Sequence, residues 1–260
     1  MKGVFDLKYQ ECNLKGETKH LVVKCIADAI GDDVKVCIQR EHLNSRKSNA
    51  EKLLKWDFIN RNLVEKFSST ELTAEYAKRG PWCLVPLLNK EKGTLFSVMK
   101  EERFNELQKR QGKRKKAHYI DALVSSFNVD LDKNKQLSFL EKNQFEENEV
   151  KSIVEGILKD FQTNSSRIHR YAIILFEEYN YELISIRCCV LDSSLQIVDE
   201  ENWNEFIHYN ESVVVDNVAK EEKEQEMPKI RLKDKARKRI GQKDTVAIKN
   251  DMASENTRVQ

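Results

Sequence analysis

The sequence predicts a single α+β domain over residues 1–215 and a disordered, charged tail over residues 216–260. Three observations predict this organisation: apolar residues recur at helical spacing early in the chain, two later stretches have the pattern of β-hairpins, and apolar residues become sparse beyond Lys220. The two hairpins are expected to share one antiparallel sheet on which the helices pack. Within the domain we expect helices over 1–75, a hairpin with helices over 76–128, a linker over 129–148, and a helix with the second hairpin over 149–208.

Helical periodicity marks the N-terminal part. Over residues 17–30 the apolar residues recur every three or four positions, and Gly31 stands where such a helix would end. The stretch 34–38 fits either a short strand or another helical turn. A longer helix is predicted over 50–67, with a wide apolar face on which Trp56 is the expected central anchor.

Two apolar stretches joined by a polar turn predict the first hairpin. Residues 82–88 have the pattern of one strand, 89–93 of the turn, and 95–99 of the returning strand. Pro86 has no backbone N–H to donate to a neighbouring strand. The first strand is therefore expected to lie at an edge of the sheet or to end at Pro86.

The second hairpin has the clearest strand pattern in the chain. Strands are expected over 171–176 and 183–191, around a turn at Tyr179-Asn180, and 195–198 is a candidate third strand. Asp199 is placed to cap a short helix that follows this segment.

Composition places the chain among soluble, charge-rich proteins. Charged residues make up 34% of it, yet the formal net charge is only +2, so attraction for a polyanion has to come from local patches. No apolar run approaches the roughly 18 residues that are needed to cross a membrane. The N-terminus also lacks the apolar core of a secretory signal. We therefore expect a cytoplasmic protein that does not contact a membrane.

The six cysteines fit a reducing compartment. They include no C-x-x-C pair, and most have apolar neighbours in the sequence. The adjacent Cys188 and Cys189 would point to opposite faces of a strand, which places them poorly for a single metal ion. We interpret the cysteines as structural thiols and expect neither a metal nor a cofactor, since the nucleotide-binding and serine-hydrolase motifs are missing as well.

The densest run of positive charge, Lys109–Lys116, lies between two predicted helices at 101–109 and 118–127. Its six cations in eight residues repel one another and have to face water or a polyanion. A second basic run extends from Lys229 to Lys243. The two runs make nucleic acid, DNA or RNA, the leading partner, although neither run indicates a sequence preference.

The candidate nucleic-acid-binding residues come from this loop, from the histidine that follows it and from the tail. His118 suits contact with a base or a phosphate, and the tail cations are interleaved with apolar residues as in an arm that orders on binding. No residue is assigned a catalytic role. The candidates are Lys109, Arg110, Lys113, Arg114, Lys115, Lys116, His118, Arg231, Arg237, Lys238 and Arg239.

Two other functions stay open. A protein-interaction factor, such as an inhibitor or adaptor in conflict between phage and host, would use apolar and aromatic contacts. A metal-dependent nuclease would need clustered carboxylates. Its candidates lie around the second hairpin and lack the Glu-x-Lys neighbour of such sites: Glu177, Glu178, Glu182 and Asp192.

Residues 130–141 resemble an EF-hand calcium loop, with oxygen-bearing side chains at positions one, three and five and Glu141 at position twelve. Lys135 replaces the glycine at position six and brings a cation beside the ion site. We interpret the segment as a polar linker ahead of a helix expected over 149–161.

Four further segments are informative together: Ala77–Trp82, Leu95–Phe104, His118–Leu123 and Leu191–Trp203. In these segments the chain resembles a family of unknown function from Gram-positive bacteria, their phages and their mobile elements. The resemblance covers most of residues 15–208 and leaves the tail after Lys220 outside. It implies one integrated unit in a bacterial or phage setting, and it transfers no catalytic residue.

Overall fold

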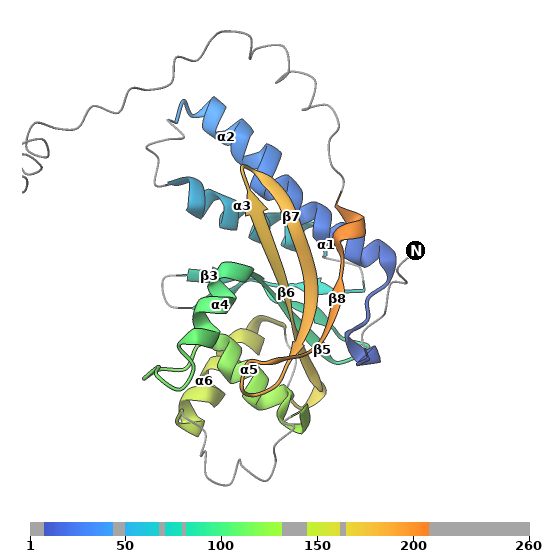
Figure 1. Ribbon diagram of the computed structural model, residues 1–260, viewed down its shortest axis with the longest axis vertical. Helices are drawn as coiled ribbons and strands as arrows, with labels where there is room; N and C mark the ends of the chain where they lie inside the picture. Colours follow the sequence, from blue (N-terminus) through green and yellow to red (C-terminus); the bar gives the residue numbers. More distant parts are fainter. Residues whose placement is uncertain are drawn as a thin grey trace, which may run out of the picture. The chain divides into compact units, whose positions relative to one another are not determined.

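A six-stranded mixed sheet with helices on both faces organises the protein, as the ribbon diagram shows (Figure 1). The computed structural model describes residues 8–43, 50–67, 71–79, 82–131, 145–161 and 165–207. All of these belong to one unit, residues 1–209. The predicted α+β class is confirmed. The predicted tail over 216–260 and most of the predicted linker lie outside the described residues.

The two predicted hairpins share one sheet, but the sheet is mixed where we expected an antiparallel one. Its strand order is β1-β4-β5-β6-β7-β8. Strands β5 and β6 run parallel, in a register that pairs Thr94 with Arg170 and Lys100 with Phe176, and every other neighbouring pair is antiparallel. The six strands are β1 (Thr73–Ala74), β4 (Leu87–Asn89), β5 (Thr94–Lys100), β6 (Arg170–Tyr179), β7 (Glu182–Leu191) and β8 (Ile197–Asn202).

The stretch 82–88 is not one strand. It is divided at Val85-Pro86, as the missing N–H of Pro86 allows. The first piece, β3 (Trp82–Leu84), pairs with β2 (Ala77–Arg79) in a separate two-stranded ribbon, and the second piece is β4. At the β4–β5 turn, Gly93 has a φ of 62° and a Cβ there would lie 2.5 Å from the Arg167 carbonyl oxygen. Only glycine fits this turn.

The N-terminal helices are continuous across the glycine that was expected to end them. Helix α1 (Gly16–Asp28) passes through a π-helical segment (Ala29–Asp33) into α2 (Val34–Arg40). The stretch 34–38 is therefore helical. Gly31 serves close packing instead of termination, because a Cβ on it would lie 3.2 Å from the Tyr181 carbonyl oxygen in the β6–β7 turn.

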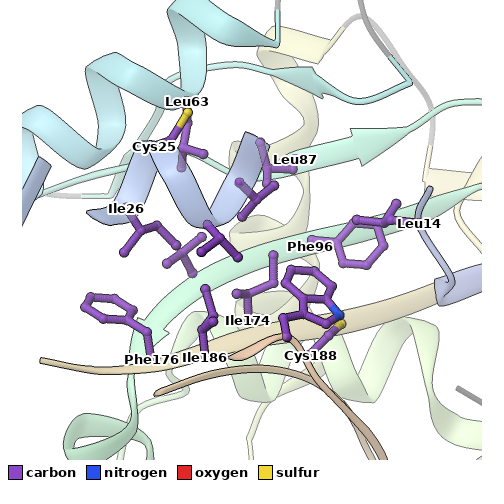
Figure 2. Packing of buried hydrophobic residues seen from close by; sticks show 14 of the residues in the cluster. Leu14, Cys25, Ile26, Leu63, Leu87, Phe96, Ile174, Phe176, Ile186 and Cys188 are labelled. Carbon is purple, nitrogen blue, oxygen red and sulfur yellow. The ribbon is translucent and has the colours of Figure 1, made fainter. Parts of the chain in front are cut away.

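Helix α3 (Ala50–Lys66) completes the layer on this face of the sheet and confirms the predicted helix over 50–67. Its buried anchors are Ile59 and Leu63, whereas Trp56 is half-buried and meets the Phe176 ring edge-on at 5.9 Å. Figure 2 shows part of this first core, in which Leu63 of α3 belongs to the same cluster as Phe96 and Ile174 of the sheet.

The opposite face carries α4 (Glu101–Lys109), α5 (Tyr119–Phe127) and α6 (Glu147–Leu158), which pack on a second core. Cys188 belongs to the first core and Cys189 to the second, so the predicted opposite orientation of the pair is confirmed. Asn128, fully buried after α5, donates from Nδ2 to the carbonyl oxygens of Tyr171 and Leu191 and accepts from the Tyr171 N–H. This one side chain joins α5 to strands β6 and β7.

The sheet ends differently from our expectation. Strand β8 includes Asp199, so that residue does not cap a helix. Its carboxylate accepts the N–H groups of Lys8 at 2.6 Å and Tyr9 at 3.4 Å instead. The short helix that follows is a single 3₁₀ turn. The 3₁₀ turns of the described chain are Gln10–Cys12, Val129–Leu131, Lys159–Phe161, Ser165–Arg167 and Asn204–Phe206.

Among the described residues, no helix is both long and apolar enough to traverse a membrane.

Candidate nucleic-acid interface

The basic run forms the connection between α4 and α5. In Figure 1 it is the green loop that projects from the ends of these two helices. Gly112 has a φ of 74°, which lets the chain reverse within a few residues. Lys109 closes α4, and the other five cations of the run follow in the loop. The structure therefore presents the run as a compact turn and not as a helix face.

One of the six cations, Arg114, stabilises the conformation of the loop. Arg114 lies half-buried and makes a two-point ion pair with Asp121 of α5, with Nη2 donating to Oδ1 at 2.7 Å and Nη1 donating to Oδ2. The Arg114 guanidinium also lies 5.7 Å from the centre of the Phe145 ring. Paired charges in a desolvated position are strongly held. Arg114 is therefore placed to stabilise the conformation of the loop.

His118 has a structural role as well. It is the N-cap of α5, where its Nδ1 accepts the Ile120 N–H at 3.4 Å and its own backbone N–H donates to Asp121 Oδ2 at 2.7 Å. Its ring packs on that of Tyr119, with 4.5 Å between the ring centres. This reciprocal cap satisfies backbone donors that the start of a helix otherwise leaves open.

The remaining five cations are exposed: Lys109, Arg110, Lys113, Lys115 and Lys116. Within the part of the chain that the structure describes, none of the five takes part in an ion pair. Lys109 and Arg110 stand at the C-terminal end of α4, where the helix dipole favours positive charge. The loop thus exposes a group of cations to solvent, and nearby negative charges neutralise them only slightly.

Neighbouring elements hold the last turn of α4 and the loop at three further points. Gln108 Nε2 donates to the Leu195 carbonyl oxygen at 2.6 Å, and Gln111 Nε2 donates to the Ser193 carbonyl oxygen at 3.4 Å. On the other side, the Ala117 N–H donates to Glu149 Oε1 of α6 at 3.2 Å. The loop is therefore attached to the β7–β8 connection and to α6, so its cations are carried on an ordered backbone.

The acidic start of α6 limits the basic surface to the loop itself. Glu147 and Glu149 occupy the first turn of α6, and Glu149 reaches the loop backbone. Opposite charge so close weakens the field beyond the loop, and exposed charges interact little beyond about 10 Å at ordinary salt. The candidate interface is thus a small, local surface, consistent with a net charge of only +2.

The chain matches the model of a protein family over most of its length. The model of a family of unknown function, DUF5986, matches residues 12–250. The chain belongs to this family. No curated protein and no solved structure matches the chain.

The DUF5986 match extends further than the resemblance that we drew from the sequence. It runs to residue 250 and so includes the second basic run, Lys229–Lys243, which we had placed outside the family. The tail candidates Arg231, Arg237, Lys238 and Arg239 lie outside the described residues. Both basic runs of this DUF5986 member consequently fall within the family pattern.

The four carboxylates that a nuclease would need do not form one cluster. Glu182 and Asp192 stand at opposite ends of β7, about 33 Å apart at the usual rise of a strand. Glu178 pairs with Lys55, at 3.3 Å, and with Lys100. Asp192 accepts the N–H groups of Ser194 and Gln196 in a turn. Glu177 accepts a hydrogen bond from the Ser185 hydroxyl. Glu177, Glu178 and Asp192 therefore each have an ordinary structural role.

The segment that resembles a calcium loop is described only at its start. Asp130, its first position, forms a two-point ion pair with Arg170 at 2.7 and 2.9 Å, and Arg170 Nε also reaches Glu11 at 3.0 Å. Residues 132–144 lie outside the described chain. The described carboxylate thus ties the 3₁₀ turn that follows α5 to strand β6.

Proposed function

We propose that this protein is a non-enzymatic nucleic-acid-binding protein that contacts phosphates through its basic loop. The observation that carries the proposal is the set of five exposed cations at the end of α4 and on the loop after it, which Arg114, Gln108 and Gln111 hold in place. We place it in the cytoplasm, as the composition and the N-terminus of the sequence led us to expect, and in a bacterial or phage-related role, as the sequence resemblance implies. The tail cations would add contacts to the same partner.

Phosphate contact of this kind predicts a measurable salt dependence. Each phosphate that a cation neutralises releases counterions, and log K falls with log salt by about 0.9 per contact on duplex DNA. Five loop contacts would give a slope of about −4.5. Phosphates carry no sequence information, so the loop predicts affinity without base preference.

The test is fluorescence anisotropy with labelled DNA and RNA at several salt concentrations, using the full chain. The loop variant changes the five exposed loop cations to Gln. A matched control changes five exposed lysines on other elements to Gln, so both variants lose the same net charge: Lys15, Lys35, Lys52, Lys66 and Lys90. The proposal requires that the loop variant weakens binding and flattens the salt slope while the control stays close to the unchanged protein.

Two results would contradict the proposal. If the unchanged protein bound no nucleic acid, the loop would be a solvated connection. If the loop variant and the control lost affinity equally, general charge and not this loop would cause the attraction. Magnesium in a parallel reaction also tests the nuclease alternative, because shortening of the label that Glu182→Gln or Asp192→Asn abolishes would show cleavage.

A second candidate is a protein-interaction factor. The observation that favours it is a pair of exposed aromatic side chains, Trp82 on β3 at 61% and Tyr179 at the end of β6 at 77%. Exposed aromatic residues are typical anchors of protein interfaces. Capture of one defined protein partner, insensitive to salt and lost on Trp82→Ala or Tyr179→Ala, would support this function over the first.

A further inference from the structure

The basic loop carries cations and no free aromatic surface. Proteins that bind single strands without sequence preference stack the bases on exposed aromatic rings, and each stacked base contributes about 1–3 kcal/mol. The rings that flank this loop are engaged elsewhere: Tyr119 is buried in the second core and the His118 ring lies on it. The described residues of this loop therefore offer a single strand positive charge but no exposed ring on which its bases could stack.

Two further rings of the described residues lie in α4 or beside the loop, and neither is exposed. Phe104 of α4 is buried, and Phe145 is half-buried and lies beside the Arg114 guanidinium. Among the described residues the exposed aromatic side chains, Tyr76, Trp82 and Tyr179, belong to the segments around β2–β3 and to the end of β6. None of these three is part of the loop or of the helices α4 and α5 that carry it, although the β2–β3 ribbon packs against α6 in the same layer.

The form of the loop points to a different ligand geometry. It projects from the ends of two helices (Figure 1), whereas a single strand is usually held along a groove. A projecting basic turn can stand between the two phosphate backbones of a double helix, whose grooves are about 6 and 12 Å wide in DNA. Its cations then meet phosphates on both strands at once.

The anchoring of the loop supports this geometry. Arg114 with Asp121, Gln108 with the Leu195 carbonyl and Ala117 with Glu149 fix the loop on three neighbouring elements. A loop ordered before binding loses little conformational entropy when it meets a rigid partner. A double helix is rigid and presents its phosphates in a fixed array, which suits such a loop better than a flexible strand does.

We infer that the basic loop recognises double-stranded nucleic acid through its paired phosphate backbones and discriminates against single strands. This inference rests on the proposed function and narrows it to one class of nucleic acid. Double-stranded DNA and double-stranded RNA share this chemistry, and separate arms of the experiment distinguish them.

The experiment measures the affinity of the full chain for four labelled probes of equal length: duplex DNA, duplex RNA, oligo-dT and oligo-rU. The loop variant and the matched five-lysine control described above are measured in parallel. We expect at least one duplex to bind about tenfold more tightly than either single strand, because the duplex has the denser phosphate charge. The loop variant should remove this preference, and the control should keep it.

The outcomes separate this inference from the proposed function. If single strands bind as tightly as duplexes and the loop variant weakens both, the duplex preference is wrong and nucleic-acid binding by the loop stands. If no probe binds, or the loop variant binds as the unchanged protein does, both are overturned. A preference for duplexes that persists in the loop variant also overturns the inference, because another surface would then cause it.

Discussion

Arg114 and Asp121, seven residues apart in the sequence, close the basic loop with a two-point ion pair in which Nη2 lies 2.7 Å from Oδ1. The same carboxylate accepts the His118 N–H at the start of α5. Asp121 is therefore the point at which the conformation of the loop and the first turn of the helix depend on each other. One cation of the run stabilises the surface that the other five present.

Because of this ion pair, we expect substitution of Arg114 to lower the stability of the protein more than substitution of its neighbours in the loop. Arg114→Lys keeps the charge but loses one of the two parallel hydrogen bonds, and we expect it to lower the free energy of unfolding by about 1–3 kcal/mol. Urea unfolding followed by tryptophan fluorescence measures this. Lys113→Gln, on the exposed part of the same loop, is the control and should change stability by less than about 0.5 kcal/mol. Equal effects of the two substitutions would show that the pair does not hold the loop.

Asn128 joins α5 to two central strands, so its removal should be costly. Asn128→Ala leaves the buried N–H and C=O of Tyr171 and the C=O of Leu191 without this partner. Each buried group left unsatisfied costs about 1–3 kcal/mol, so we expect a total loss of about 3 kcal/mol or more. Asn105→Ala, on the exposed side of α4, serves as the control and should be nearly neutral. A small loss at Asn128 would mean that water replaces its hydrogen bonds.

Lys19 and Glu201 form a buried ion pair between α1 and β8, and Trp203 Nε1 donates to the same carboxylate at 2.8 Å. Lys19→Met leaves the buried Glu201 carboxylate without its positive partner, and we expect it to destabilise the protein by about 3–5 kcal/mol. Adding Glu201→Gln removes the unpaired carboxylate charge and keeps an acceptor for Trp203. The double variant should therefore recover much of the lost free energy of unfolding. A double-mutant cycle by chemical denaturation checks this. Simple additivity of the two substitutions would contradict it.

Buried thiols predict the response of the protein to alkaline pH. Burial raises the pKa of Cys12, Cys25 and Cys189 from 9.0 to about 12. Between these values the unfolded chain releases thiol protons that the folded chain keeps. Their contribution to stability is therefore complete below pH 9.0 and is lost as the pH rises to about 12.

The measurement is the free energy of unfolding across this pH window under reducing conditions. Each such thiol contributes a fall of at most about 1.4 kcal/mol per pH unit. Cys25→Ala should make the fall less steep, whereas Cys83→Ser, at an exposed position, should leave it unchanged. A profile that Cys25→Ala does not alter would show that other groups cause the alkaline loss.

Much of the fold follows from local sequence patterns. The helices over 50–67 and 101–109 and the strands around Asn180 were predicted because their periodicity is strong and their turns carry the expected residues. The parallel pairing of β5 with β6 was not predicted, because strands so far apart leave no local mark of their register. One signal was present: 171–176 is an uninterrupted apolar run, which is typical of a strand buried on both faces.

The candidate site was predictable in composition but not in detail. Charge density identified the loop, yet nothing in the run distinguishes Arg114 from Lys113 or Lys115. The spacing of His118 and Asp121, three residues apart, is that of a capping box with an unusual first residue, and it could have indicated that His118 caps a helix. The prediction that a helix ends at Gly31 was wrong because a glycine that ends a helix and one that admits a close neighbour look identical in sequence.

The parallel pairing of β5 with β6 also determines the order in which the protein can be completed during synthesis. Strand β5 and the N-terminal helices leave the ribosome before the partner strand of β5 has been translated, because residues 101–169 separate the two strands. Until β6 and β7 have been translated, one edge of β5 is unpaired, and the apolar faces of α1 and α3 lack the part of the core that these two strands supply. A chain that stops before Arg170 would therefore be an aggregation-prone fragment and not a smaller working domain.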